Sequence, residues 1–115
     1  MDIRYLVSQE EVDISIQHWD AHCHFSINSS STQDYLNCKG FRSLVEMGRP
    51  ALPFIYNAIE TEKFAGEFGW RNHLGSLVGH IVGDELDVPK EMWGKVQEVK
   101  NYTVDWLKNY VENLK

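Results

Sequence analysis

The stretch FRSLVEMGRPALPFIYNAIE, residues 41–60, decides the fold class of this chain. Its apolar residues recur every three or four positions on both sides of Gly48 and Pro50, which is the period of two amphipathic helices. Gly48 is suited to ending the first helix, and Pro50 to the first turn of the second, where a missing N–H costs nothing. The stretch therefore predicts a helical hairpin in an all-α protein.

Similar spacings along the rest of the chain predict a compact bundle of about five helices forming a single domain, residues 1–115. Besides the hairpin, the predicted helices are roughly 9–24, with a capping box from Ser8 to Glu11; a short one starting near Gln33; about 70–82; and a long C-terminal helix, about 89–113, opened by Pro89. The sequence leaves one alternative open and predicts one local break. Alternating Val12, Ile14 and Ile16 also fit a strand at 11–16, and Gly40 predicts a break near 38–40.

Glycines recur every four residues in the predicted helix 70–82, at Gly75, Gly79 and Gly83. An interior glycine costs a helix about 1 kcal/mol relative to alanine, so two of them require a reason. Close packing of another helix is the favoured explanation, and a ligand lying against bare backbone is the alternative.

Composition excludes several classes of function. The net charge of −6 argues against binding to a phosphate backbone, because such binding needs clustered Lys and Arg; we therefore expect no nucleic-acid partner. No run of about 18 apolar residues exists, so no membrane span is expected, and the acidic N-terminus does not resemble a signal peptide. We expect a cytoplasmic protein in which Cys23 and Cys38 are free thiols. No cofactor motif is present.

The residues Val45-Glu46-Met47-Gly48-Arg49-Pro50-Ala51-Leu52-Pro53 resemble the turn of one HEAT-type helical unit. HEAT-like modules are helical interaction scaffolds, so the resemblance implies a binding surface without chemistry of its own. No second copy appears at a fixed period, and a solenoid needs about three. We therefore expect one HEAT-like unit within a compact bundle.

The order of segments also resembles small bacterial and phage helical proteins of no known activity. The segments that carry this resemblance are Ser29-Ser30, Phe41 to Gly48, Ala51-Leu52-Pro53, Trp70 to Gly83 and Trp106-Leu107. The resemblance implies a fold and transfers no catalytic residue.

A histidine-rich cluster, HWDAHCH at residues 18–24, is the clearest candidate for metal chemistry. On a helix, His18 and His22 share one face at a spacing that can bind zinc, whereas His24 lies on another. Asp20, His22 and His24 also resemble the DxHxH motif of amidohydrolases, which implies a metal-dependent hydrolase. The amidohydrolase barrel needs more than about 200 residues, and this chain has 115. The favoured interpretation is therefore that the cluster consists of exposed histidines at the end of a helix.

Candidate ligand-binding residues surround the glycine-bearing helix. They are Ser29, Ser30, Trp70, Arg71, His73, Gly79 and His80. His73 and His80 are seven residues apart and so lie on nearly the same side of a helix, where they can line a pocket with a polar rim.

Three functions follow from these observations. The favoured one is a small acidic interaction module that binds and inhibits or adapts a macromolecule, as immunity proteins, antitoxins and anti-defence proteins do; a protein with a basic surface is the expected partner. The alternatives are a small-molecule-binding protein and, least favoured, a metal-dependent hydrolase at His22 and His24. The sequence leaves the oligomeric state open, a homo-oligomer included.

Overall fold

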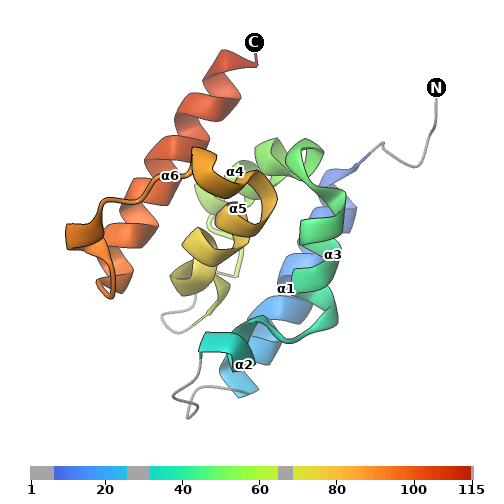
Figure 1. Ribbon diagram of the computed structural model, residues 1–115. Helices are drawn as coiled ribbons and strands as arrows, with labels where there is room; N and C mark the ends of the chain where they lie inside the picture. The colour runs from blue at the N-terminus through green and yellow to red at the C-terminus, as the bar shows by residue number, and fades with distance from the viewer. Residues whose placement is uncertain (1–6, 26–31, 65–68, 115) are drawn as a thin grey trace.

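The structure, a computed structural model, describes residues 7–25, 32–64 and 69–114. Within these ranges the protein is all-α, as predicted, and contains no strand (Figure 1). The described residues form six α-helices where about five were expected: α1 (Gln9–Phe25), α2 (Thr32–Leu36), α3 (Lys39–Met47), α4 (Leu52–Glu60), α5 (Leu74–Val82) and α6 (Val96–Asn113). The same ranges contain four 3-10 turns: Arg49–Ala51, Trp70–His73, Gly83–Glu85 and Lys90–Met92.

Helix α1 begins as the capping box predicts, and no strand forms at residues 11–16. The hydroxyl of Ser8 accepts a hydrogen bond from the backbone N–H of Glu11, at 3.2 Å. The buried side of α1 is formed by Val12, Ser15, Ile16, Trp19 and Cys23. The structure therefore follows the helical spacing of the apolar residues, not the short alternation that suggested a strand.

The predicted helix–turn–helix at residues 41–60 is present, but its two helices do not pack mainly on each other. Gly48 ends α3 with φ of 69°, and its N–H donates to the carbonyl oxygen of Leu44. Pro50 lies in the 3-10 turn that leads into α4. Beyond the turn, α3 packs chiefly on α1 and α4 chiefly on α6. The turn thus follows the prediction, while the helices find partners elsewhere in the chain.

Gly40 lies inside α3 and marks its closest approach to α1. A Cβ at this position would lie 2.4 Å from the carbonyl oxygen of Ser15 and 2.7 Å from the backbone nitrogen of Trp19. The predicted break is just before it, at residues 37–38 between α2 and α3. Glycine is therefore present at this position because the two backbones meet there, not because the helix ends.

Aromatic rings occupy the centre of the core. Trp19 of α1 lies with its ring centroid 5.1 Å from that of Phe41 and 6.0 Å from that of Trp70. Each of the two indole N–H groups donates to a backbone carbonyl, that of Tyr35 for Trp19 and that of Lys63 for Trp70. Helices α1 and α3 and the turn before α5 are thus joined at one point.

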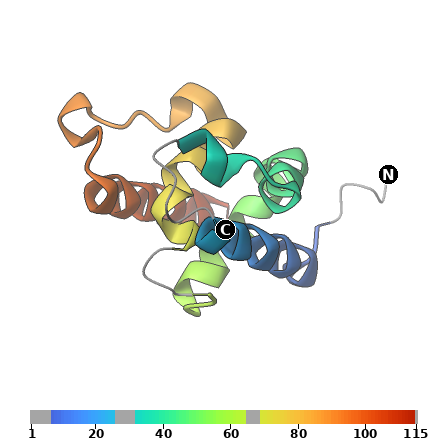
Figure 2. The same ribbon diagram turned by 90° about the horizontal axis from the view of Figure 1, so that it is seen from below.

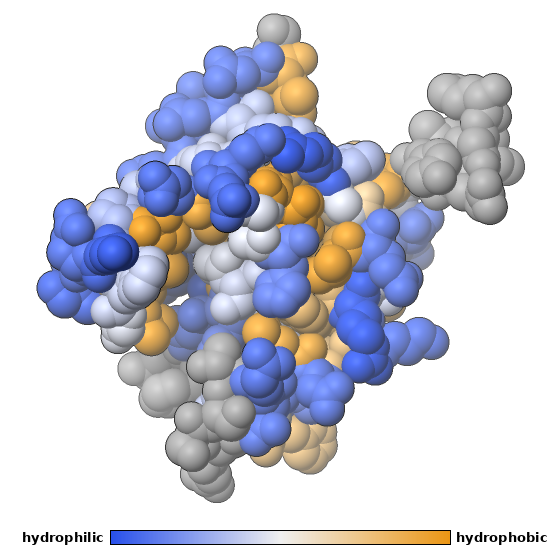
Figure 3. Space-filling model, in the orientation of Figure 1, coloured by the Kyte–Doolittle hydropathy of each residue, from blue (hydrophilic) through white to orange (hydrophobic). Residues whose placement is uncertain are grey.

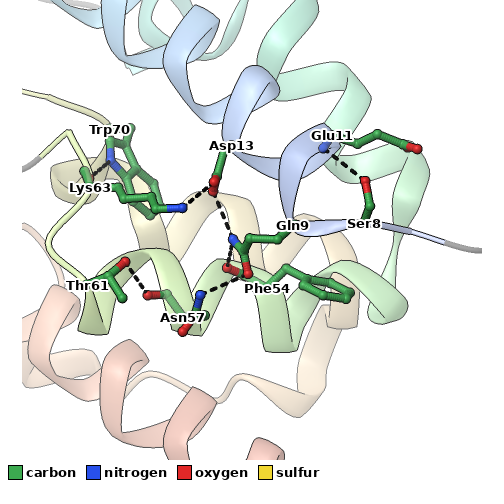
Figure 4. Close-up of polar contacts among 9 residues, drawn as sticks. All are labelled: Ser8, Gln9, Glu11, Asp13, Phe54, Asn57, Thr61, Lys63 and Trp70. Carbon is green, nitrogen blue, oxygen red and sulfur yellow. Dashed lines mark hydrogen bonds and ion pairs between the residues drawn. The ribbon is translucent and has the colours of Figure 1, made fainter.

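A polar network ties the start of α1 to α4 (Figure 4). Asp13 forms an ion pair with Lys63 and accepts a hydrogen bond from the amide of Gln9, at 2.8 Å. The same amide nitrogen donates to the carbonyl oxygen of Phe54, and the Gln9 oxygen accepts from Asn57, each at 3.0 Å. The network satisfies these partly buried groups, so its role is structural.

The C-terminal helix begins later than predicted. Helix α6 starts at Val96 rather than near Pro89, because Gly94 adopts φ of 82° and interrupts the helical path. Residues 83–95 instead form a connection containing two 3-10 turns, which we call the acidic loop. Figure 2 shows this loop, in orange, standing out from one side of the bundle. None of the helices in the described ranges is long and apolar enough to cross a membrane.

Candidate functional site

Trp70 and Arg71, two of the predicted ligand residues, have structural roles. The indole of Trp70 is fully buried, and its backbone N–H donates to the carboxylate of Asp20, at 3.0 Å. A guanidinium nitrogen of Arg71 donates to the carbonyl oxygen of Ile59, at 3.1 Å. Both residues fasten the turn before α5 to other elements. Ser29 and Ser30 lie outside the described residues.

His73, at the end of the 3-10 turn before α5, and His80, within α5, line different hollows. The ring of His73 stacks on Tyr35 at a centroid distance of 4.5 Å, and burial there lowers its pKa. His80 is exposed; its Nδ1 lies 2.6 Å from the carbonyl oxygen of Ser76, and its ring meets Phe41 edge-on. His73 lines a hollow of about 250 Å³ against the start of α6, whereas His80 lines another of about 280 Å³ against α2 and α3.

The three glycines near α5 have three different surroundings. A Cβ on Gly75 would lie 2.7 Å from a methyl carbon of Val99, so here α5 and α6 pack closely. Gly83 ends the helix with φ of 62°. Around Gly79 nothing lies within 4 Å of an added Cβ. The predicted helix crossing therefore involves Gly75, and the expectation of packing at Gly79 was wrong.

The side chains of the histidine cluster, residues 18–24, have separate surroundings. His18 is exposed, His22 Nε2 lies 2.6 Å from the carbonyl oxygen of Asp34, and His24 lies 3.5 Å from the carboxylate of Asp20. Among the residues that the structure describes, no three His, Cys, Asp or Glu side chains are placed to hold a metal ion. His22 connects α1 to α2, which is a structural role.

Cys23 and Cys38 are free thiols, as predicted. Cys23 is fully buried, and burial raises the pKa of its thiol to about 12. A thiol in that state is a poor nucleophile, so Cys23 acts as a small apolar core residue. Cys38 caps α3, since its sulfur accepts a hydrogen bond from the N–H of Phe41.

The acidic loop extends through residues 89–95, which were predicted to belong to the C-terminal helix. It is fastened at three points by side chains from other elements. Tyr102 and Trp106 of α6 donate to the carbonyl oxygens of Asp87 and Glu85, at 2.8 Å and 3.1 Å. Arg49, in the turn before α4, forms two hydrogen bonds with the Glu85 carboxylate and lowers its pKa. These contacts give a long connection a defined shape.

Trp93 is presented to solvent by this loop. Its side chain is 63% exposed, yet the indole N–H donates to the carbonyl oxygen of Val88, at 3.1 Å, which fixes the ring. The ring borders an open hollow of about 470 Å³ whose other lining residues are Asp84, Leu86, Asp87 and Val88. Two carboxylates beside an aromatic face suit a positively charged group, because the ring face and the carboxylates both attract cations.

Trp93 escaped prediction because residues 89–113 were assigned to one helix. The available signal was Gly94, a helix breaker directly after Trp93. The other exposed large apolar residues are Ile14 and Phe25 of α1, Val96 and Leu114. On the face seen in Figure 3, apolar patches are small and separated by hydrophilic residues.

Comparison of the chain with protein-family models, with functionally characterised proteins and with solved structures found no match.

Proposed function

We propose that this protein is a small interaction module that binds a protein partner with a basic surface through the acidic loop. The observation that carries the proposal is Trp93, an exposed aromatic ring held in place beside two carboxylates. Tryptophan is among the residues most enriched at the energetic centres of protein interfaces. A ring fixed before binding loses little conformational freedom on association, which favours affinity.

Charge supports the choice of a basic partner. The whole chain carries −6, and the acidic loop has the carboxylates of Asp84, Glu85, Asp87 and Glu91 against the two ammonium groups of Lys90 and Lys95. Complementary charge accelerates encounter and selects among partners, while the apolar ring supplies affinity. An inhibitor, antitoxin or immunity protein acts in this way, by covering a functional surface of its target without catalysis.

The experiment is affinity capture from extracts of the source cell, with the wild type and two variants compared. Trp93→Ala removes the proposed anchor, and Leu114→Ser is the matched control, because Leu114 is 58% exposed at the far end of α6. We expect a basic protein to be captured by the wild type and by Leu114→Ser but lost with Trp93→Ala. Capture that is equal for all three proteins, or no specific capture by any, would refute the proposal.

A second candidate function, small-molecule binding, is favoured by the 250 Å³ hollow between α5 and α6. Its lining combines His73, Gly75, Ser76 and Lys95 with apolar Val96 and Val99. Ligand pockets usually enclose about 300–1,000 Å³, so this hollow lies just below their usual range. Native mass spectrometry of the purified protein tests it: a retained small molecule that His73→Ala releases would favour this function over partner binding.

A further inference from the structure

Helix α1 carries an exposed stripe formed by Ile14, His18, Ala21 and Phe25. These residues recur at intervals of four, three and four, so they lie along one line of the helix. All four are exposed, Ile14 by 47% and Phe25 by 91%. The elements that α1 contacts, mainly α3 and also α2, α4 and the turn before α5, pack on its other side. The α1 stripe is thus a helix face without a packing partner.

We propose that the α1 stripe binds the α1 stripe of a second copy of the chain, with the two helices antiparallel. Residues spaced four, three and four apart form a line along which two helices can interdigitate, and three of the four residues here are apolar. These four residues include no carboxylate, although the chain as a whole is acidic, which lowers the repulsion between two copies that meet along them. This surface contains none of the residues of the acidic loop.

The charges beside the stripe favour the antiparallel arrangement. Glu10 and Glu11 lie in the first turn of α1, and His24 lies in its last turn. In a parallel pair the glutamates of one copy would face those of the other, which is repulsive. In an antiparallel pair the glutamates of the two copies lie at opposite ends of the contact, and the two helix dipoles oppose each other.

The register follows from matching the stripe to itself. Ile14 then packs against Phe25 of the second copy, and His18 against its Ala21, so that the symmetry axis passes between positions 18 and 21. With a rise of 1.5 Å per residue, the two copies of position 21 are offset by only about 4.5 Å along the helix, and those of position 10 by about 28 Å.

Sedimentation equilibrium from about 10 µM to about 1 mM tests association over the range expected of a small interface. We expect a monomer–dimer equilibrium that Ile14→Ser and Phe25→Ser each weaken at least about tenfold. Leu114→Ser, a change of an equally exposed residue on α6, should leave it unaltered. A wild type that stays monomeric throughout, or a dimer that neither α1 variant weakens, would overturn the proposal.

Disulfide cross-linking tests the direction of the helices. In a Cys38→Ser background, which keeps a side chain able to cap α3, Cys23 remains buried and unreactive. Ala21→Cys should then form a covalent dimer on oxidation, and Glu10→Cys should not. In a parallel pair both positions would meet their counterparts, so equal cross-linking of the two variants would overturn the antiparallel arrangement.

Discussion

Gly40 and Gly79 are both glycines inside helices, yet their surroundings differ. At Gly40 an added Cβ would collide with the backbone of α1, which cannot yield as the end of a flexible side chain can. At Gly79 the space is open. The two positions therefore form a matched pair that tests the packing of α1 on α3.

Gly40→Ala should destabilise the protein by about 1–3 kcal/mol, because α1 and α3 must separate to admit the methyl group. Gly79→Ala should instead stabilise it by about 0.5–1 kcal/mol through higher helix propensity. Urea denaturation of both variants measures these changes. If the two substitutions had equal effects, the close approach at Gly40 would be wrong.

The lowered pKa of His73 makes the stability of the folded protein depend on pH. Burial lowers its pKa in the folded protein below the ordinary value of 6.5, so the unfolded chain binds the proton more readily. The contribution of neutral His73 is therefore fully present above pH 6.5 and is lost as the pH falls through and below that value.

The variant His73→Gln should lose less stability than the wild type between pH 7 and pH 5. Thermal melting across this range is the measurement. His80→Gln is the matched control, because it makes the same substitution at an exposed histidine of α5. A wild-type pH dependence that persists in His73→Gln would show that another group is responsible.

At the scale of elements, the acidic loop depends on donors from α6. Tyr102→Phe removes only the hydroxyl that donates to Asp87 and keeps the ring. A hydrogen bond of this kind contributes about 1 kcal/mol, so backbone amides in residues 83–95 should exchange about fivefold faster with solvent. Hydrogen-exchange mass spectrometry measures this, with Tyr56→Phe in α4 as the control. Unchanged exchange in Tyr102→Phe would mean that the loop holds its shape without α6.

Local patterns predicted the elements well and their partners poorly. The Ser8 cap, the stripe of α1 and the glycine stop at Gly48 depend on neighbours within a few residues, and all three are present. That α3 packs on α1 and α4 on α6 depends on the whole chain, and a loose turn motif does not determine it. The predicted start of the last helix failed for a similar reason. Proline favours a first helical turn, but Gly94 five residues later ended any helix begun there.

The candidate site shows the same difference between local features, which the sequence predicts, and long-range contacts, which it does not. Sequence spacing placed His73 and His80 on one side of a helix, but His73 lies in the 3-10 turn before α5 and stacks on Tyr35, whereas His80 lies within α5 beside Phe41. The acidic loop is held by hydrogen bonds from Arg49, Tyr102 and Trp106 to Glu85 and Asp87. Each donor lies 15 or more residues from its acceptor in the sequence. No local pattern encodes contacts of that range.

At the scale of the whole molecule, two surfaces are open to other macromolecules. The acidic loop offers a fixed aromatic ring among carboxylates, and the α1 stripe offers a narrow apolar line. They use different residues, so the chain can pair with itself and still present the loop. In that case two loops would be displayed by one dimer, which raises avidity for a partner that carries repeated sites.

We propose that Trp93 anchors a basic partner, and the affinity of the captured partner for this protein tests that role most directly. Calorimetric titration should give a dissociation constant for Trp93→Ala at least about 30-fold weaker than that of the wild type, which corresponds to an anchor of about 2 kcal/mol. Binding by both proteins should weaken as salt is raised, because opposite charges are screened. Equal dissociation constants for the wild type and Trp93→Ala would contradict the account.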